Sequence, residues 1–120
     1  MPTFPPTAKL SQPDQYRRVF DSPKYKVSSG AFLLLATTSV TPSSRLGVVV
    51  AKKNIRRAVR RNRIKRLVRE QFRHHPFDAA IDLVVLARSG ADPLDNPSIW
   101  QELDRLWRTL EQKVNAQCGG

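Results

Sequence analysis

Residues 52–73, KKNIRRAVRRNRIKRLVREQFR, carry almost all of the net charge of this chain. They hold eleven lysines and arginines and a single acid, Glu70, which gives +10 of the formal net charge of +11. The remaining residues hold ten bases and nine acids and are nearly neutral. Any fold of this chain must therefore place one strongly cationic segment where its side chains reach solvent or a polyanion.

The second part of this segment has the periodicity of an amphipathic helix. At about 100° per residue, a sector of roughly 140° holds the apolar side and one glutamine: Ile64, Leu67, Val68, Gln71 and Phe72. A polar stripe faces the other way: Asn62, Arg66, Arg69 and Arg73. The apolar register is broken upstream, and Pro76 forbids continuation. The pattern predicts a helix that begins between residues 57 and 60 and ends near residue 74, after a basic loop over residues 52–56.

A solvated charged face is the ordinary explanation for a run of charges, but it fits this helix poorly. Solvated faces mix signs, with acids about four residues before bases. Here only Arg66 and Glu70 form an opposite pair at that spacing, in the less favourable order. Because so many like charges repel one another, we expect the stripe to bind a polyanion.

The residues of this segment also resemble a known signature. Their order is Lys52-Lys53, Ala58-Val59, Arg61-Asn62-Arg63, Lys65-Arg66 and Arg69-Glu70. The bacterial ribonuclease P protein subunit is similar, with a lysine pair, a spacer, Ala-Val and then Arg-Asn-Arg-x-Lys-Arg-x-x-Arg-Glu. The resemblance extends over residues 9–112.

The resemblance implies an accessory subunit of a ribonucleoprotein endonuclease, a nuclease and hydrolase of tRNA processing. Its partners would be the ribonuclease P RNA, bound 1:1, and the 5′ leader of precursor tRNA. The catalytic groups would come from the RNA, which would also bind most of the Mg²⁺. The acids of this chain are scattered and show no paired-carboxylate spacing, so we expect no catalytic residue or metal ligand among them.

The rest of the chain reads as one domain. We expect helices over residues 14–20 and 98–115 and strands over 24–27, 31–38, 45–51 and 81–87. The pattern favours an antiparallel hairpin between the second and third strands, and a β-α-β unit around the basic helix. We expect a flexible proline-rich arm at 1–10, a domain at 11–116 and a tail at 117–120.

The resemblance implies an α/β (α+β) two-layer sandwich in the order α-β-β-β-α-β-α. It also implies a left-handed β-α-β crossover, against the usual hand, as in the ribosomal protein S5 domain 2-like fold.

Two groups of side chains are candidates for RNA contacts. We expect phosphate or base contacts from Lys52, Lys53, Arg57, Arg60, Arg61, Asn62, Arg63, Lys65, Arg66 and Arg69. Arg61 and Asn62 match the centre of the signature, whereas Arg57 and Lys65 flank the apolar sector and are the alternative candidates for bracing the fold.

Aromatic side chains form the second group. Tyr16 and Phe20 are spaced i, i+4 on the first helix, and Phe32 begins a strand; the resemblance implies a leader-binding cleft at these positions. Core packing is the alternative role for all three. Leu35 stands where some family members carry an aromatic. Trp100 and Trp107, seven residues apart on the last helix, are expected in the core.

The composition excludes several classes. No apolar run could span a bilayer, the first residues lack a signal-peptide core, and the single cysteine, Cys118, excludes an internal disulfide framework. We therefore expect a cytoplasmic protein.

His74 and His75 diverge on a helix and suit its C-terminus better than a metal site. A ribosomal-type structural RNA-binding protein is the main alternative; DNA binding and a membrane-surface helix are weaker ones.

Overall fold

The computed structural model describes residues 13–39, 44–74 and 80–118. The elements, in chain order, are α1 (Pro13–Asp21), β1 (Tyr25–Ser28), β2 (Phe32–Thr38), β3 (Arg45–Val50), α2 (Ala58–His74), β4 (Ile81–Ala87), the short 3₁₀ helix η2 (Ser89–Ala91) and α3 (Asn96–Cys118). This is the expected α+β order. The basic helix α2 begins and ends within the expected limits.

The strands form one four-stranded sheet in the order β1-β2-β4-β3. Strands β1, β2 and β4 pair antiparallel, whereas β3 and β4 pair parallel and are connected through α2. The expected β-α-β unit is thus confirmed. The expected antiparallel hairpin between the second and third strands is wrong, because β4 lies between β2 and β3.

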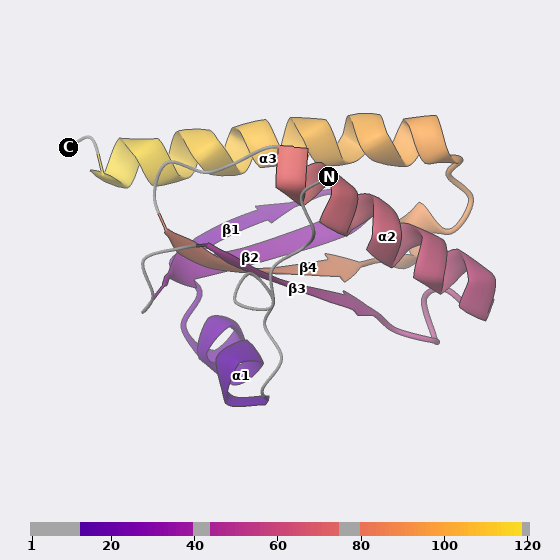
Figure 1. The fold of residues 1–120 in the computed structure, drawn as a ribbon, viewed down its shortest axis with the longest axis horizontal. Helices are drawn as coiled ribbons and strands as arrows, with labels where there is room; N and C mark the ends of the chain where they lie inside the picture. The colour runs from indigo at the N-terminus through magenta and orange to yellow at the C-terminus, as the bar shows by residue number, and fades with distance from the viewer. Residues whose placement is uncertain (1–12, 40–43, 75–79, 119–120) are drawn as a thin grey trace.

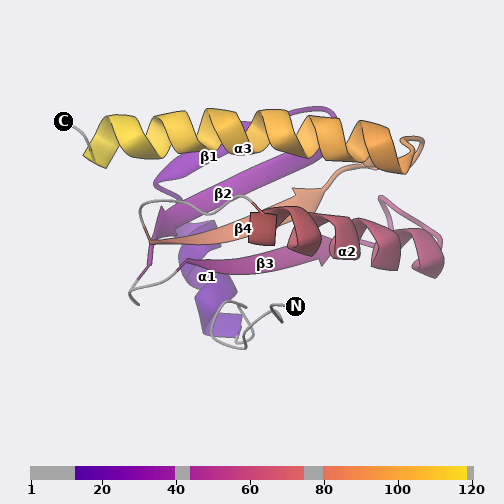
Figure 2. The same cartoon turned by 45° about the horizontal axis from the view of Figure 1, so that its top comes forward.

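Helices cover both faces of this sheet (Figures 1 and 2). Helices α2 and α3 lie side by side on one face and form the second layer of the sandwich, and the short α1 lies against the other face. The main core fills the space between the sheet and α2/α3, with Trp107, Phe32 and Leu34 fully buried. The ring of Phe72 on α2 lies 6.3 Å from that of Trp107 on α3, which joins the two helices.

Alternation along the strands assigns each side chain to a face. Leu34 and Ala36 of β2 belong to the main core, whereas Leu35 belongs to a smaller cluster with Val19 of α1 and Val84 of β4. The side chain of Trp107 is in the core as expected, but Trp100 is 37% exposed. The expectation that both tryptophans lie in the core is therefore wrong for Trp100; near the start of α3 the buried side chains are Ile99 and Leu103.

The chain ends differ in part from the expected domain limits. Helix α3 continues to Cys118, two residues into the segment 117–120 that was expected to be a tail. The expected proline-rich arm at 1–10 and His75 lie outside the described residues.

Candidate nucleic-acid interface

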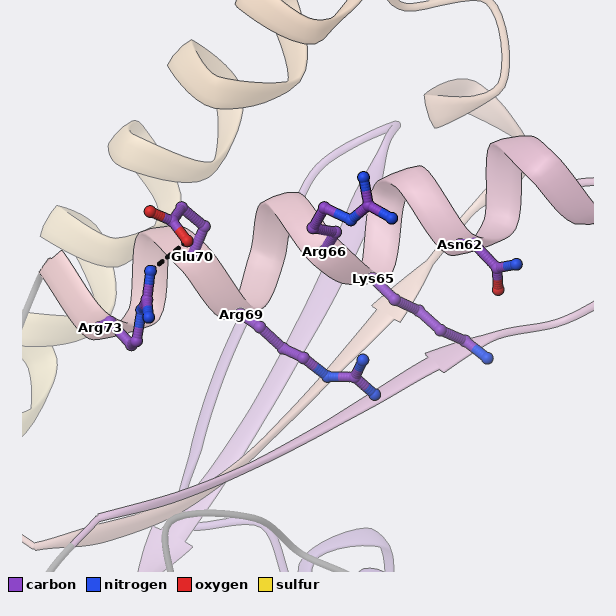
Figure 3. Close-up of a pocket in the computed structure, with 6 residues that line it drawn as sticks. All are labelled: Asn62, Lys65, Arg66, Arg69, Glu70 and Arg73. Atoms are coloured by element: carbon purple, nitrogen blue, oxygen red, sulfur yellow. Dashed lines mark hydrogen bonds and ion pairs between the residues drawn. The ribbon is translucent and has the colours of Figure 1, made fainter. Parts of the chain in front are cut away.

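The outer side of α2 carries a stripe of cationic side chains over a shallow hollow. The residues that line the hollow are Asn62, Lys65, Arg66, Arg69, Glu70 and Arg73. Figure 3 shows Asn62, Lys65 and Arg69 extending to one side of the helix and Arg66 to the other. Helical spacing brings them together, because residues three and four apart are neighbours on a helix surface. We call Asn62, Lys65, Arg66 and Arg69 the α2 stripe.

The only acid of α2 is bound at the end of the helix and does not neutralise the stripe. Glu70 accepts a hydrogen bond from Arg73 and lies 3.2 Å from Nε2 of His74. The pairing of Glu70 with Arg66 that the spacing suggested is therefore not the one formed. Among the described residues, no carboxylate forms an ion pair with Lys65, Arg66 or Arg69, so this stripe keeps its full positive charge.

Arg60 forms hydrogen bonds within the protein, and its predicted contact with RNA stays a prediction. Its Nε donates to Oδ1 of Asp92 at 2.9 Å, and its Nη2 donates to the carbonyl oxygens of Asp92 and, at 3.2 Å, Leu94. The guanidinium group thus ties the first turns of α2 to the loop that follows β4. For Arg57 and Lys65, bracing of the fold is the alternative to RNA contact. In the structure Arg57 is exposed and Lys65 is partly exposed.

Arg61 also contacts the protein itself. Its Nη1 donates to the carbonyl oxygens of Ile55 at 3.0 Å and of Arg56 at 2.7 Å, and so closes the turn that leads into α2. Asn62, its neighbour in the signature, is exposed. Arg61 therefore shapes the backbone of residues 55–57, and its contact with RNA stays a prediction, as does that of Asn62. The remaining candidates, Lys52, Lys53 and Arg63, are all exposed.

The aromatic candidates divide between the two faces of the sheet. Phe20 is 41% exposed on α1, and Tyr16 is partly buried beside it. Phe32 is 0% exposed and its side chain is part of the main core. The prediction that Phe32 lines the same cleft is wrong, because alternation along β2 turns its side chain toward α3 and away from α1.

Gly47 of β3 allows Tyr16 to lie against the sheet. A Cβ atom at position 47 would be 2.5 Å from Cε1 of Tyr16 and 2.8 Å from its hydroxyl oxygen, so any larger residue would displace the ring. Burial raises the pKa of the Tyr16 hydroxyl, and the positive charge of Arg69 opposes this rise. Tyr16 thus lies within the electrostatic reach of the α2 stripe.

A row of aliphatic side chains continues this face beyond Tyr16. Leu33 of β2 pairs with Leu86 of β4, which pairs with Val49 of β3. All three are only partly buried, and they pack against the small cluster under α1. Sequence reasoning missed this row. Leu35, which stands where some family members carry an aromatic, is itself buried against α1. The missing information was which face of each strand α1 covers.

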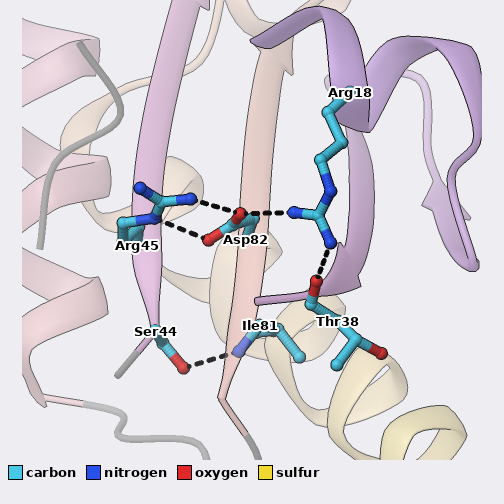
Figure 4. Close-up of polar contacts among 6 residues, drawn as sticks. All are labelled: Arg18, Thr38, Ser44, Arg45, Ile81 and Asp82. Carbon is cyan, nitrogen blue, oxygen red and sulfur yellow. Dashed lines mark hydrogen bonds and ion pairs between the residues drawn. The ribbon is translucent and has the colours of Figure 1, made fainter. Parts of the chain in front are cut away.

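A buried charge network fixes α1 to the sheet on this face (Figure 4). Asp82 of β4 is fully buried and accepts hydrogen bonds from Nε and Nη2 of Arg45 at 2.9 and 2.7 Å. It also accepts one from Arg18 of α1 at 2.9 Å, and Arg18 donates a second, at 2.6 Å, to the carbonyl of Thr38. The hydrogen bond with Asp82 raises the pKa of Arg45. The network sets the position of α1, and therefore of Tyr16 and Phe20.

The described residues contain no group of three or more His, Cys, Asp and Glu side chains placed to hold a metal ion. None of the helices in this part of the chain has the length and apolarity needed to cross a membrane.

These features define a class of protein: a small α+β domain with one strongly basic helix and, around α1, a sheet face with partly exposed aromatic and aliphatic side chains. The sequence pattern of the Ribonuclease P family matches residues 4–111. The ribonuclease P protein component of Marinobacter nauticus is 43% identical over 111 residues, which are 92% of this chain and 84% of that protein. That of Pseudomonas aeruginosa is 47% identical over 97 residues, 80% of this chain and 72% of that protein.

Solved structures give the same result. The RNase P protein of Staphylococcus aureus superposes with a TM-score of 0.78 at 27% identity, over 85% of this chain and 94% of that one. The protein from Thermotoga maritima gives 0.72 at 28% identity, over 87% and 96%. The chain belongs to the ribonuclease P protein family, as the signature in residues 52–73 predicted.

Proposed function

We propose that this chain is the RNA-binding subunit of ribonuclease P that, together with the catalytic RNA, removes the 5′ leader from precursor tRNA. Family membership supports the assignment to this ribonucleoprotein. The observation that carries the binding role is the α2 stripe, whose cations form no ion pair among the described residues. Phosphates of the RNA subunit are the ligands that such a row of guanidinium and ammonium groups binds best.

The leader binds, in this proposal, on the face of the sheet that carries α1. Phe20 and Tyr16 offer aromatic surface for stacking on unpaired bases, and the row Leu33–Leu86–Val49 offers an aliphatic floor beside them. A single strand can use both, because every base has an apolar face that needs no particular sequence. The nearness of Arg69 to Tyr16 lets phosphate and base contacts follow one strand.

The protein's part in the reaction is binding and positioning. The Mg²⁺ needed for phosphodiester hydrolysis would be held mainly by the RNA, in a 1:1 complex in the cytoplasm. The protein raises the affinity for substrates that carry a leader and screens the repulsion between the two RNAs with its net positive charge. None of its side chains is assigned a proton transfer.

Phe20→Ala tests the leader site with little risk to the fold, because Phe20 is exposed and belongs to neither buried cluster. Stacking on one base is worth about 1–3 kcal/mol, so we expect the reconstituted enzyme to bind a precursor tRNA with a leader about tenfold more weakly. Its affinity for mature tRNA should not change. Trp100→Ala is the matched control, since Trp100 is similarly exposed but lies on α3, across the sheet. An equal loss of affinity for precursor and mature tRNA would contradict the leader site, and so would an equally large effect of Trp100→Ala.

A further inference from the structure

A second groove lies at the start of α2, between the turn that precedes the helix and the loop that follows β4. Its lining residues are Asn54, Arg56, Arg57, Arg60, Ser89, Asp92 and Pro93. Asn54, Arg56, Ser89 and Pro93 were not among the residues predicted to bind RNA. The groove is therefore a feature of the fold that the basic sequence pattern alone does not describe.

Hydrogen bonds hold both walls of this groove in place. Arg60 of α2 binds the side chain of Asp92 and the carbonyl oxygens of Asp92 and Leu94. The Asn54 amide donates to the carbonyl of Ala87, at the end of β4, at 3.1 Å. These contacts join segments more than 30 residues apart in the chain, so the shape of the groove is built by tertiary structure.

The charge of the groove favours an anion. Three arginines and one acid line it, and that acid, Asp92, is ion-paired with Arg60. Arg56 and Arg57 remain, both exposed, and within the described part of the chain neither guanidinium forms an ion pair. Ser89 is also exposed and can donate a hydrogen bond from its hydroxyl. The lining is thus cationic, with its one carboxylate already neutralised.

The groove and the α2 stripe lie on opposite sides of the helix. Arg60 and Arg69 are nine residues apart, which at about 100° per residue places their side chains about 180° from each other. A straight RNA backbone segment that follows the stripe therefore does not reach this groove. Two backbone segments that lie close together, as in a folded RNA, can occupy both surfaces.

We propose that this groove is a second phosphate-binding site, which takes a backbone segment of a folded RNA separate from the segment on the α2 stripe. The proposal rests on the proposed function in one respect, that the RNA is the ribonuclease P RNA. Arg56 and Arg57 contact the phosphates, Ser89 donates to a phosphate oxygen, and Arg60 holds the loop that forms the far wall.

The test places a negative charge in the groove without removing any of its hydrogen bonds. Ser89→Glu should weaken binding to a bacterial ribonuclease P RNA transcript about tenfold, and should reduce the slope of log K against log salt by about one, because one phosphate contact is lost. The matched control is Gln101→Glu, the same change in charge at an exposed position of α3, which should leave affinity within about twofold. Circular dichroism should show the same unfolding midpoint for both.

A second variant keeps the test decisive if Ser89→Glu unfolds. Arg56→Gln with Arg57→Gln should reduce the salt slope by about two. If Ser89→Glu behaves as Gln101→Glu does, or if the double variant keeps the wild-type slope, the groove binds no phosphate. These results differ from failure of the proposed function, in which the wild-type chain itself does not stimulate cleavage of precursor tRNA by the ribonuclease P RNA.

Discussion

Asp82→Ala is expected to lower the free energy of unfolding by about 3–5 kcal/mol, the usual cost of removing one partner of a buried ion pair. Asp82 is the only carboxylate that contacts Arg45 or Arg18 among the described residues. The Arg45 side chain is only 11% exposed, so its charge cannot be fully hydrated after the substitution. The Arg18 side chain is 40% exposed, so its charge stays better hydrated and the loss of its contact with Asp82 costs less. Urea unfolding followed by circular dichroism measures the difference.

Asp104→Ala is the matched control for that experiment. Asp104 also binds an arginine, Arg108 at 3.1 Å, but here the arginine is 72% exposed and the carboxylate 40% exposed. Exposed pairs of this kind contribute about 0–1 kcal/mol. If Asp82→Ala costs no more than Asp104→Ala, the network does not hold α1 on the sheet. A large cost would mean that contacts outside the basic helix stabilise the face of the sheet that carries Tyr16 and Phe20.

The second large effect is expected on RNA binding. Replacing Lys65, Arg66 and Arg69 together with glutamine should weaken binding to ribonuclease P RNA about 10²-fold at 0.1 M salt. The slope of log K against log salt should fall by two to three, at about 0.9 per phosphate contact. Folding should be little affected, because these cations form no ion pair among the described residues and glutamine keeps a good helix propensity.

A triple substitution on α3 removes the same charge from another surface. Arg105, Arg108 and Lys113 are exposed on α3, where two of them pair with acids of the same helix. Replacing these three with glutamine should change the affinity by no more than about threefold. Similar losses for the two triple variants would mean that overall charge, and not the α2 stripe, determines binding.

The sequence predicted the elements of this fold better than their arrangement. The limits of α2 followed from local signals, namely the helical period of its apolar residues and the proline after it. The order of strands did not, because β2, β3 and β4 are similar apolar runs and nothing local selects their partners. Strand β4 lies between β2 and β3 and is buried on both faces, which the sequence IDLVVLA permits but does not require.

For the candidate site, too, the sequence predicted the local features better than the tertiary contacts. The charge and spacing of residues 52–73 identified the basic helix and, through the signature, the family. Arg60 could not be separated from its neighbours, because its role depends on Asp92, 32 residues away. Phe32 was misplaced since one residue of register changes the face of a strand. The Arg18–Asp82–Arg45 network joins three elements and leaves no local pattern.

The most direct test of the central claim is cleavage of a precursor tRNA by a bacterial ribonuclease P RNA at low Mg²⁺, with and without this protein. Removal of the 5′ leader should be strongly stimulated by the wild-type chain, and stimulation should fall for the Lys65, Arg66 and Arg69 variant but not for the α3 control. Salt-sensitive binding to folded RNA without any stimulation of cleavage would contradict the claim and indicate a structural, ribosomal-type RNA-binding protein.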